Sequence, residues 1–200
     1  MPDKTLAPYF TENLIEVGVD EVGRGCLCGD VVAAAVILPK IFNLPQLIDS
    51  KLLSEKERYR LRPIIEAQAL AYAIGIATIE EIDKFNIANA SYLAMHRAIE
   101  QIQKLKPELL LIDGKYFKST LSLPHRCIIK GDSKFASIAA ASVLAKTFRD
   151  DYMKVLHAEF PNYDWKNNMG YPTKKHREGI KNFGTTPLHR TSFKLFASGF

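Results

Sequence analysis

Two adjacent carboxylates beside a glycine-flanked arginine are the residues of this chain best suited to chemistry. Asp20 and Glu21 follow an apolar run and stand directly before Gly23, Arg24 and Gly25. Neighbouring acids repel one another and resist burial unless a cation joins them. A divalent cation such as Mg²⁺ prefers oxygen ligands and keeps positions open for phosphate and water. Because glycine also permits close backbone approach, the stretch predicts phosphodiester chemistry, with a charged turn between strands as the alternative.

Three further acids could complete a metal site. Asp113 follows an apolar run and precedes a glycine, and open α/β sheets collect functional groups at such strand ends. A turn residue with a local hydrogen bond is the alternative for Asp113. Asp150 lies on a predicted helix, where pairing with a neighbouring base is the alternative. Asp132 could bind metal too, but its place just before that helix favours an N-cap.

Two-metal hydrolysis of a phosphodiester requires about four carboxylates that converge on one point. The chain supplies candidates from two predicted strand ends and one helix, so this geometry is feasible. Residues 20 and 21 would point to opposite faces of a regular strand. Shared metal binding by both therefore requires a twist or a break at this place.

The elements expected to position these acids alternate between strands and helices. Ser54 and Glu57 form a capping-box pattern at the start of the first helix. The small, apolar residues 136–145 predict a helix that packs closely against a sheet. The pattern as a whole predicts an α/β domain with a helical C-terminal appendage, with strands at 14–19, 30–38, 69–77, 109–112 and 126–129 and helices at 55–68, 87–105, 134–160 and 173–183.

The composition is that of an ordinary globular domain of 200 residues, 47% hydrophobic and 24% charged. Its net charge of +5 permits a polyanionic partner, and the surplus is concentrated from Lys166 onward, where seven basic residues face one acid. No apolar run approaches the ~20 residues needed to span a bilayer, and no signal peptide is evident. Three cysteines do not resemble a disulfide framework, so we expect a cytoplasmic protein in which Cys26 and Cys28 pack near the turn.

A series of short motifs runs in order along nearly the whole chain, from about Val17 to Phe193, and together they resemble the ribonuclease HII family, type 2 ribonuclease H. Each motif alone is weak, but their order and spacing make the resemblance specific. They are Asp20-Glu21-Val22-Gly23-Arg24-Gly25, Asp49-Ser50-Lys51, Ile82-Asp83, Ile112-Asp113-Gly114, Lys130-Gly131-Asp132, Ser137 to Lys146, Arg149-Asp150, Gly170-Tyr171-Pro172 and His189-Arg190-Thr191-Ser192-Phe193.

The resemblance implies a ribonuclease H-like mixed sheet flanked by helices, and a set of roles at its site. The catalytic Mg²⁺ or Mn²⁺ ions, two in the substrate complex, would be bound by Asp20, Glu21, Asp113 and Asp150. Gly23, Arg24 and Gly25 would sense the 2′-hydroxyl of a ribonucleotide, and Tyr171 would stack on the next deoxyribose. The implied phosphate contacts are Ser50, Lys51, Lys146, Lys174 and Arg190.

The function implied is that of a metal-dependent endoribonuclease that acts on RNA/DNA hybrids and cuts 5′ of single ribonucleotides in duplex DNA, leaving 5′-phosphate and 3′-hydroxyl ends. Residues 1–165 would form the catalytic domain, and residues 166–200 a basic segment that packs on it and contacts substrate. We expect a monomer without a membrane partner, and find no clamp-binding motif. A junction resolvase of the same superfamily and a non-catalytic duplex-binding protein are the alternatives.

Some positions depart from the family pattern. Residues 26–30 replace the proline-rich sequence that usually follows the glycines, and Met169 stands where the family often has lysine. His176 and His189 could serve as acid or base groups, although lone histidines are more often structural.

Overall fold

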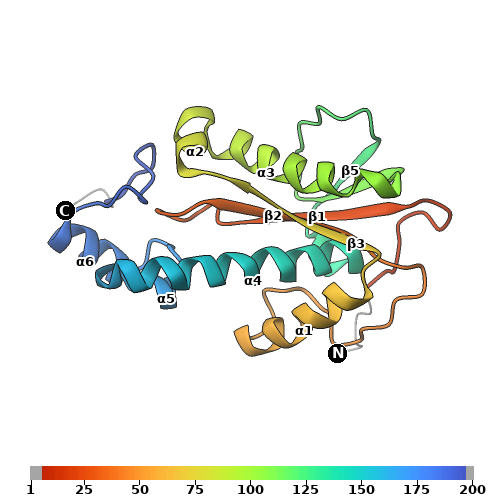
Figure 1. Ribbon diagram of the computed structural model, residues 1–200, viewed down its shortest axis with the longest axis horizontal. Coiled ribbons are helices and arrows are strands. Elements are labelled where there is room, and N and C mark those ends of the chain that lie inside the picture. Colours follow the sequence, from red (N-terminus) through yellow and green to blue (C-terminus); the bar gives the residue numbers. More distant parts are fainter. Residues whose placement is uncertain (1–5, 197–200) are drawn as a thin grey trace.

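A five-stranded mixed sheet forms the centre of the computed structural model, which describes residues 6–196 (Figure 1). The strand order is β3-β2-β1-β4-β5. The first three strands in the chain are antiparallel neighbours, whereas β4 and β5 run parallel to β1. The strands are β1 Glu16–Val22, β2 Val31–Ile37, β3 Ala71–Ala77, β4 Leu109–Asp113 and β5 His125–Ile128.

Helices cover both faces of this sheet (Figure 1). The helix α3 packs on one face, α4 crosses the other along β1 and β2, and α1 lies against α4. The predicted α/β fold is confirmed, although the short helix α2 was not predicted. The helices are α1 Glu55–Gln68, α2 Ile79–Phe85, α3 Ile87–Gln101, α4 Ala136–Glu159, α5 Trp165–Asn168 and α6 Lys174–Phe183, with short 3-10 turns at Gln103–Leu105, Gly131–Ser133 and Pro161–Tyr163. None of the helices in this described part of the chain is long and apolar enough to cross a membrane.

The contact between β1 and α4 is unusually close. Gly18 lies in β1 opposite the first turn of α4, and a Cβ atom there would be 2.1 Å from the Ser137 carbonyl carbon. The alanine-rich start of α4 packs against Ala34 and Val36 of the neighbouring strand. Because small residues meet on both sides, the helix backbone approaches the sheet directly, and the segment before α4 is held at the end of β1.

The strand register brings the predicted acids together. Val19 pairs with Ile112 in the parallel ladder of β1 and β4. The next residue in each strand is an aspartate, Asp20 and Asp113. Both strands run in the same direction, so both carboxylates leave the sheet at the same end.

The start of α4 differs from the prediction. We expected Asp132 to cap the helix, but α4 begins at Ala136, and its N-cap is Phe135 with no side-chain capping bond. Residues 131–133 form a separate 3-10 turn, which directs the buried Asp132 side chain elsewhere. The predicted capping box of Ser54 and Glu57 is present at α1.

A buried aromatic cluster joins α6 to the end of α4 and contains His176 and His189. The Trp165 indole N–H donates to His176 Nε2 at 2.9 Å, and His176 Nδ1 donates to the Tyr171 carbonyl at 3.0 Å. The Thr186 N–H donates to His189 Nδ1, so the proton of His189 lies on Nε2, 3.2 Å from His176 Nε2. Burial lowers the pKa of both histidines, that of His189 to about 4. Both are neutral structural groups rather than an acid or a base.

We predict that Gly18→Ala destabilises the fold, because the new methyl group would overlap the Ser137 backbone. The helix α4 would have to move away from β1, which costs about 1–3 kcal/mol in a packed core. Urea denaturation measures the loss. The control is Gly25→Ala, where a Cβ atom would meet only the Tyr171 ring at 3.8 Å. Equal losses of stability in the two variants would contradict this account of the contact.

Candidate active site

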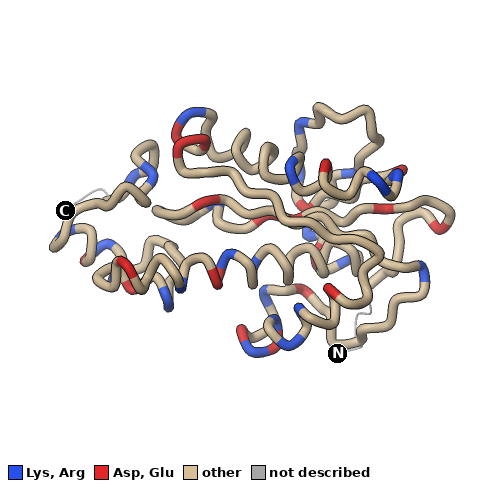
Figure 2. Tube along the Cα trace, viewed as in Figure 1, with Lys and Arg blue, Asp and Glu red and all other residues tan. Residues whose placement is uncertain are grey.

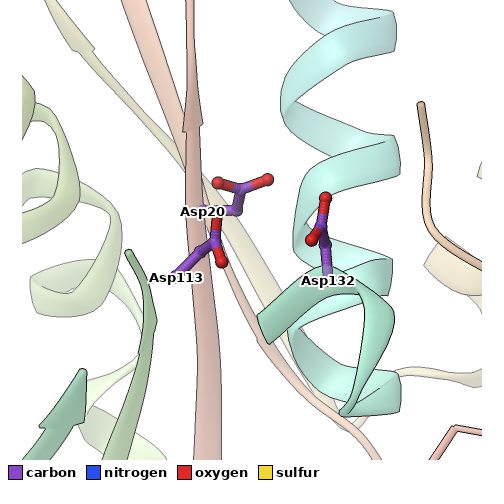
Figure 3. A group of neighbouring side chains, drawn as sticks. All are labelled: Asp20, Asp113 and Asp132. Carbon is purple, nitrogen blue, oxygen red and sulfur yellow. The ribbon is translucent and has the colours of Figure 1, made fainter. Parts of the chain in front are cut away.

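Three carboxylates converge at the end of the sheet where β1 and β4 finish. One carboxylate oxygen from each of Asp20, Asp113 and Asp132 lies within 4.8 Å of the others (Figure 3). The first two come from neighbouring strands, and Asp132 reaches them from the 3-10 turn before α4. Asp20 and Asp132 are both buried. Such a group of oxygen ligands suits a hard divalent cation.

Local hydrogen bonds hold the turn of Asp132 against β4. The Gly131 N–H donates to Asp113 Oδ1 at 2.7 Å. A Cβ atom on Gly131 would be 2.6 Å from Ile138 Cδ1 and 3.3 Å from the same Asp113 oxygen, so a larger residue would require the Ile138 side chain to move. The glycine therefore permits the close approach of Asp132 to Asp113.

The environment of Asp132 fits a cation. Its Oδ2 accepts from Lys51 Nζ at 2.7 Å, while the buried Oδ1 has no hydrogen-bond partner among the described residues. An unpaired buried carboxylate oxygen is costly, and a metal ion would satisfy it. The Lys51 side chain is 61% exposed, so it pairs with Asp132 from the solvent side.

Burial and mutual repulsion alter the proton affinity of these acids. Burial raises the pKa of Asp20 to about 7, the nearby charge of Lys146 opposes the shift, and Glu21 and Asp113 add to it. The pKa of Asp113 is also raised, chiefly by burial. Protein groups offset little of the negative charge of Asp20 and Asp113, as expected for a site that binds a cation.

Two hydroxyls and one lysine lie behind Asp20. Ser50 Oγ and Ser142 Oγ are 2.7 Å apart, and Lys146 Nζ donates to Ser142 Oγ at 2.9 Å. Ser50 is fully buried. Its predicted phosphate contact is therefore wrong, because its hydroxyl is enclosed by α4. Lys146 is half-buried and places a positive charge near Asp20.

Glu21 does not join the three aspartates in this arrangement. The ladder of β1 continues without a break through Glu21 and Val22, so Asp20 and Glu21 alternate across the strand. The Glu21 carboxylate instead accepts from Arg24 Nη1 at 3.0 Å. Burial raises the pKa of Glu21 despite this contact with Arg24, and the charge of Asp113 acts in the same direction.

The structure does not bring Asp150 to the three aspartates, contrary to its predicted role as a metal ligand. Its Oδ2 lies 3.6 Å from Arg58 Nη2 of α1. Asp150 is about four turns along α4, whereas Asp132 precedes that helix and adjoins Asp113 through Gly131. The long helix therefore carries Asp150 away from the sheet end.

The loop after β1 is fixed by a buried arginine of α4. Gly23 has φ +95°, and a Cβ atom there would be 2.3 Å from Arg149 Nε. The guanidinium of Arg149 donates to the carbonyls of Asp30, Met169 and Cys28 at 2.9, 2.7 and 3.1 Å. Arg149 thus supports the loop from the protein interior by donating hydrogen bonds to backbone carbonyl oxygens.

A second arginine, Arg190 of the C-terminal segment, supports the same loop through its side chain. It is fully buried, and its guanidinium donates four hydrogen bonds, two to the Gly29 carbonyl and one each to those of Arg24 and Cys26. Burial lowers the pKa of Arg190 to about 10. Its predicted phosphate contact is wrong, since its donors are bound to backbone inside the protein. Cys26 and Cys28 are buried in this loop, so both contribute to packing.

Comparison with known proteins decides the family. The ribonuclease HII family matches residues 17–196. The ribonuclease HII of Bacteroides fragilis is 61% identical over 194 residues, which are 97% of this chain and 96% of that protein. The chain belongs to the ribonuclease HII family. Membership makes it a ribonuclease H, a hydrolase that cleaves nucleic acid internally, and confirms the resemblance found in the sequence.

Solved structures of ribonucleases HII and HIII share the fold. The PCNA:RNase HII complex from Archaeoglobus fulgidus matches with a TM-score of 0.74 and 24% identity, over 92% of this chain and 97% of that one. Bst-RNase HIII in complex with Mn²⁺ matches with a TM-score of 0.63 and 20% identity, over 86% of this chain and 63% of that one. The mixed sheet and its helices are thus those of ribonuclease H-like proteins.

Other residues predicted to bind substrate lie on the surface. Tyr171 is 44% exposed and stands beside Gly25. Lys174 is the first residue of α6, and its side chain is 90% exposed. Lys174 Nζ lies 3.8 Å from Glu178 Oε1. The Met169 carbonyl accepts hydrogen bonds from Arg149 Nη1 and from the Cys26 thiol. Figure 2 shows basic residues along α6.

We predict that Asp20→Asn stabilises the metal-free protein at pH 8. The folded-state pKa of Asp20 is raised from 3.8 to about 7, so the native state retains the proton longer and loses stability as pH rises through this window. The variant should gain on the order of 1–4 kcal/mol at pH 8 and little at pH 4, measured by denaturation in a chelator. A gain that is equal at both pH values would contradict the burial penalty.

Proposed function

We propose that this chain cuts the RNA strand of RNA/DNA hybrids and cuts 5′ of a ribonucleotide followed by DNA in a duplex, leaving 5′-phosphate and 3′-hydroxyl ends. Membership of the ribonuclease HII family supports the reaction class. The observation that carries the substrate proposal is the loop of Gly23 and Gly25 with the exposed Tyr171 beside it. This loop directly follows the strand that holds Asp20.

We assign the divalent ions, Mg²⁺ or Mn²⁺, to Asp20, Asp113 and Asp132, with Glu21 adjacent on β1. The clustered oxygens and the unpaired Oδ1 of Asp132 support this assignment, and Bst-RNase HIII has been solved with Mn²⁺. When bound, two such ions supply a hydroxide-like nucleophile and charge stabilisation for the leaving 3′ oxygen. Lys51 neutralises Asp132 in the metal-free protein and, being exposed, is free to turn toward a phosphate.

Discrimination between RNA and DNA is assigned to the loop backbone. Only the 2′-hydroxyl separates the two at one nucleotide, and it can donate and accept hydrogen bonds. Gly25 is exposed and presents main-chain groups without a side chain in the way, whereas the buried Gly23 leaves room for Arg149 under the loop. The ring of Tyr171 lies next to Gly25 and offers a flat apolar surface to the following sugar. Arg24 is held by Glu21, with its side chain 48% exposed.

The basic C-terminal segment, residues 166–200, is assigned a substrate contact outside the reaction centre formed by residues 1–165. Its exposed lysines, Lys174 among them, would meet phosphates and make binding dependent on salt concentration. We further propose that the protein acts as a monomer in the cytoplasm, where its three free cysteines stay reduced. The Archaeoglobus fulgidus relative was solved with PCNA, but we found no clamp-binding sequence here and do not propose such a partner.

Two substitutions separate the revised metal ligands from the predicted ones. Asp132→Asn should abolish cleavage and weaken Mn²⁺ binding more than tenfold, because it removes a buried anionic oxygen from the cluster. Asp150→Asn should leave Mn²⁺ affinity within about twofold, since Asp150 faces Arg58 instead. Isothermal titration calorimetry measures both. Loss of Mn²⁺ binding in Asp150→Asn with retention in Asp132→Asn would reverse the assignment.

The substrate proposal is tested by comparing the cleavage of four nucleic acids. The protein, with Mg²⁺ or Mn²⁺, is incubated with a DNA duplex that contains one ribonucleotide, an RNA/DNA hybrid, an all-DNA duplex and a four-way junction. We expect cleavage of the first two only, with the single cut on the 5′ side of the ribonucleotide. Cleavage of the junction would indicate a resolvase, and binding without cleavage would indicate a non-catalytic role. Asp113→Asn should bind the duplex without cutting it.

A further inference from the structure

The short helix α2 is bound to the C-terminal segment through a single carboxylate. Asp83 Oδ2 accepts from the Thr191 N–H at 3.0 Å and from its hydroxyl at 2.8 Å. Asp83 Oδ1 accepts from the N–H of Ser192 at 3.1 Å and from its hydroxyl. Burial would raise the pKa of Asp83, but these hydrogen bonds lower it. Two of the four donors are main-chain groups, so Asp83 fixes the backbone of residues 191 and 192.

Arg190, which precedes Thr191, binds the loop that follows β1. Arg190 N donates to the Leu27 carbonyl at 2.9 Å, and its guanidinium binds the carbonyls of Gly29, Cys26 and Arg24. Arg190 forms no salt bridge within residues 6–196. The guanidinium binds backbone oxygens, and its Cζ lies 5.1 Å from the centroid of the Phe193 ring in the same segment. Its position therefore depends on where the backbone of its own segment is anchored.

The same helix also holds the far end of the loop. The N–H of Ile79, the first residue of α2, donates to Asp30 Oδ1 at 3.1 Å. The loop from Gly23 to Asp30 therefore has two attachments to α2, one direct and one through Asp83 and Arg190. The second reaches the carbonyl of Arg24, between the two glycines.

We propose that Asp83 is a positioning residue for ribonucleotide discrimination, acting through Thr191, Ser192 and Arg190 on the loop at Gly23–Gly25. This inference rests on the proposed function of that loop. Recognition by main-chain groups depends on their placement, because a shift of about 1 Å can reduce a rate by roughly 100-fold. No hydrogen bond of the described residues joins Asp83 to Asp20, Asp113 or Asp132, so its effect should spare metal binding.

The test compares Asp83→Ala with Glu100→Ala, which removes an exposed acid from α3. Steady-state kinetics are measured on a duplex with one ribonucleotide and on a uniform RNA/DNA hybrid, and Mn²⁺ affinity is measured by calorimetry. For Asp83→Ala we expect kcat on the single ribonucleotide to fall about tenfold or more, with KM and Mn²⁺ affinity within about twofold. The hybrid should suffer less, since it offers a 2′-hydroxyl at every position. Glu100→Ala should match the unaltered protein.

A second variant keeps the test decisive if Asp83→Ala folds poorly. The double change Thr191→Val with Ser192→Ala removes both hydroxyl donors but leaves both main-chain donors, so it should show a smaller loss of the same pattern. Hydrogen exchange of the amides at residues 23–30 should be faster in both variants than in Glu100→Ala.

Two results would overturn the inference: unchanged kcat on the single ribonucleotide in both variants, or equal losses on the two substrates, as a general loss of structure would give. Failure of the unaltered protein to cut at a single ribonucleotide would instead refute the proposed function, so the two failures are distinguishable.

Discussion

The parallel pairing of β1 with β4 forces two carboxylates into one buried space, and the surrounding structure has to keep them there. Asp20 and Asp113 extend from neighbouring strands at the same end. The turn at Gly131 then adds Asp132 to the group. Ionising buried acids so close together is unfavourable, as the raised pKa of Asp20 indicates. The site therefore opposes folding locally, and the tight packing of α4 on β1 must compensate for it.

The loop after β1 is supported by two buried arginine side chains that bind backbone carbonyls instead of carboxylates. Arg149 and Arg190 are both fully buried, and both direct their donors at carbonyl oxygens rather than at carboxylates. A buried guanidinium needs most of its donors satisfied, so it imposes a definite path on the backbone around it. The carbonyls it binds face inward. Arg24 and Gly25 are exposed on the outer side beside Tyr171, whereas Gly23 is buried against Arg149.

Sequence periodicity and motifs predicted most of the fold, because strand and helix patterns here are local. The sheet, the capping box at Ser54 and the helices α1, α3, α4 and α6 follow from such patterns. The short helix α2 was missed, since seven residues carry too little periodicity. The site was predicted in part: Asp20 and Asp113 stand at strand ends, a position that sequence can identify.

The predicted roles of four residues, Asp132, Asp150, Ser50 and Arg190, differ from the structure because their environment depends on distant segments. For Asp132 a helix cap was favoured over a metal ligand, yet its carboxylate meets a strand that ends 19 positions earlier in the chain. Arg190 and Ser50 were taken for surface phosphate contacts, yet both are fully buried. Residue type alone cannot reveal burial of a polar group, which is set by tertiary neighbours. The sequence Lys130-Gly131-Asp132 was the available signal for the position of Asp132, since a glycine beside an acid permits close approach.

The contrast between the two halves of the site has a physical consequence. The carboxylates are held in a state that a cation would relieve, so their arrangement is sensitive to charge and to pH. The loop is fixed by hydrogen bonds from arginines and, further back, by Asp83, whose pKa is lowered because hydrogen bonds from Thr191 and Ser192 outweigh the effect of burial. Metal occupancy and loop position can therefore vary independently. Under the proposed function, selectivity for ribonucleotides could therefore be lost while the metal site stays intact, and the distinction between the two losses would lie in residues outside the carboxylate cluster.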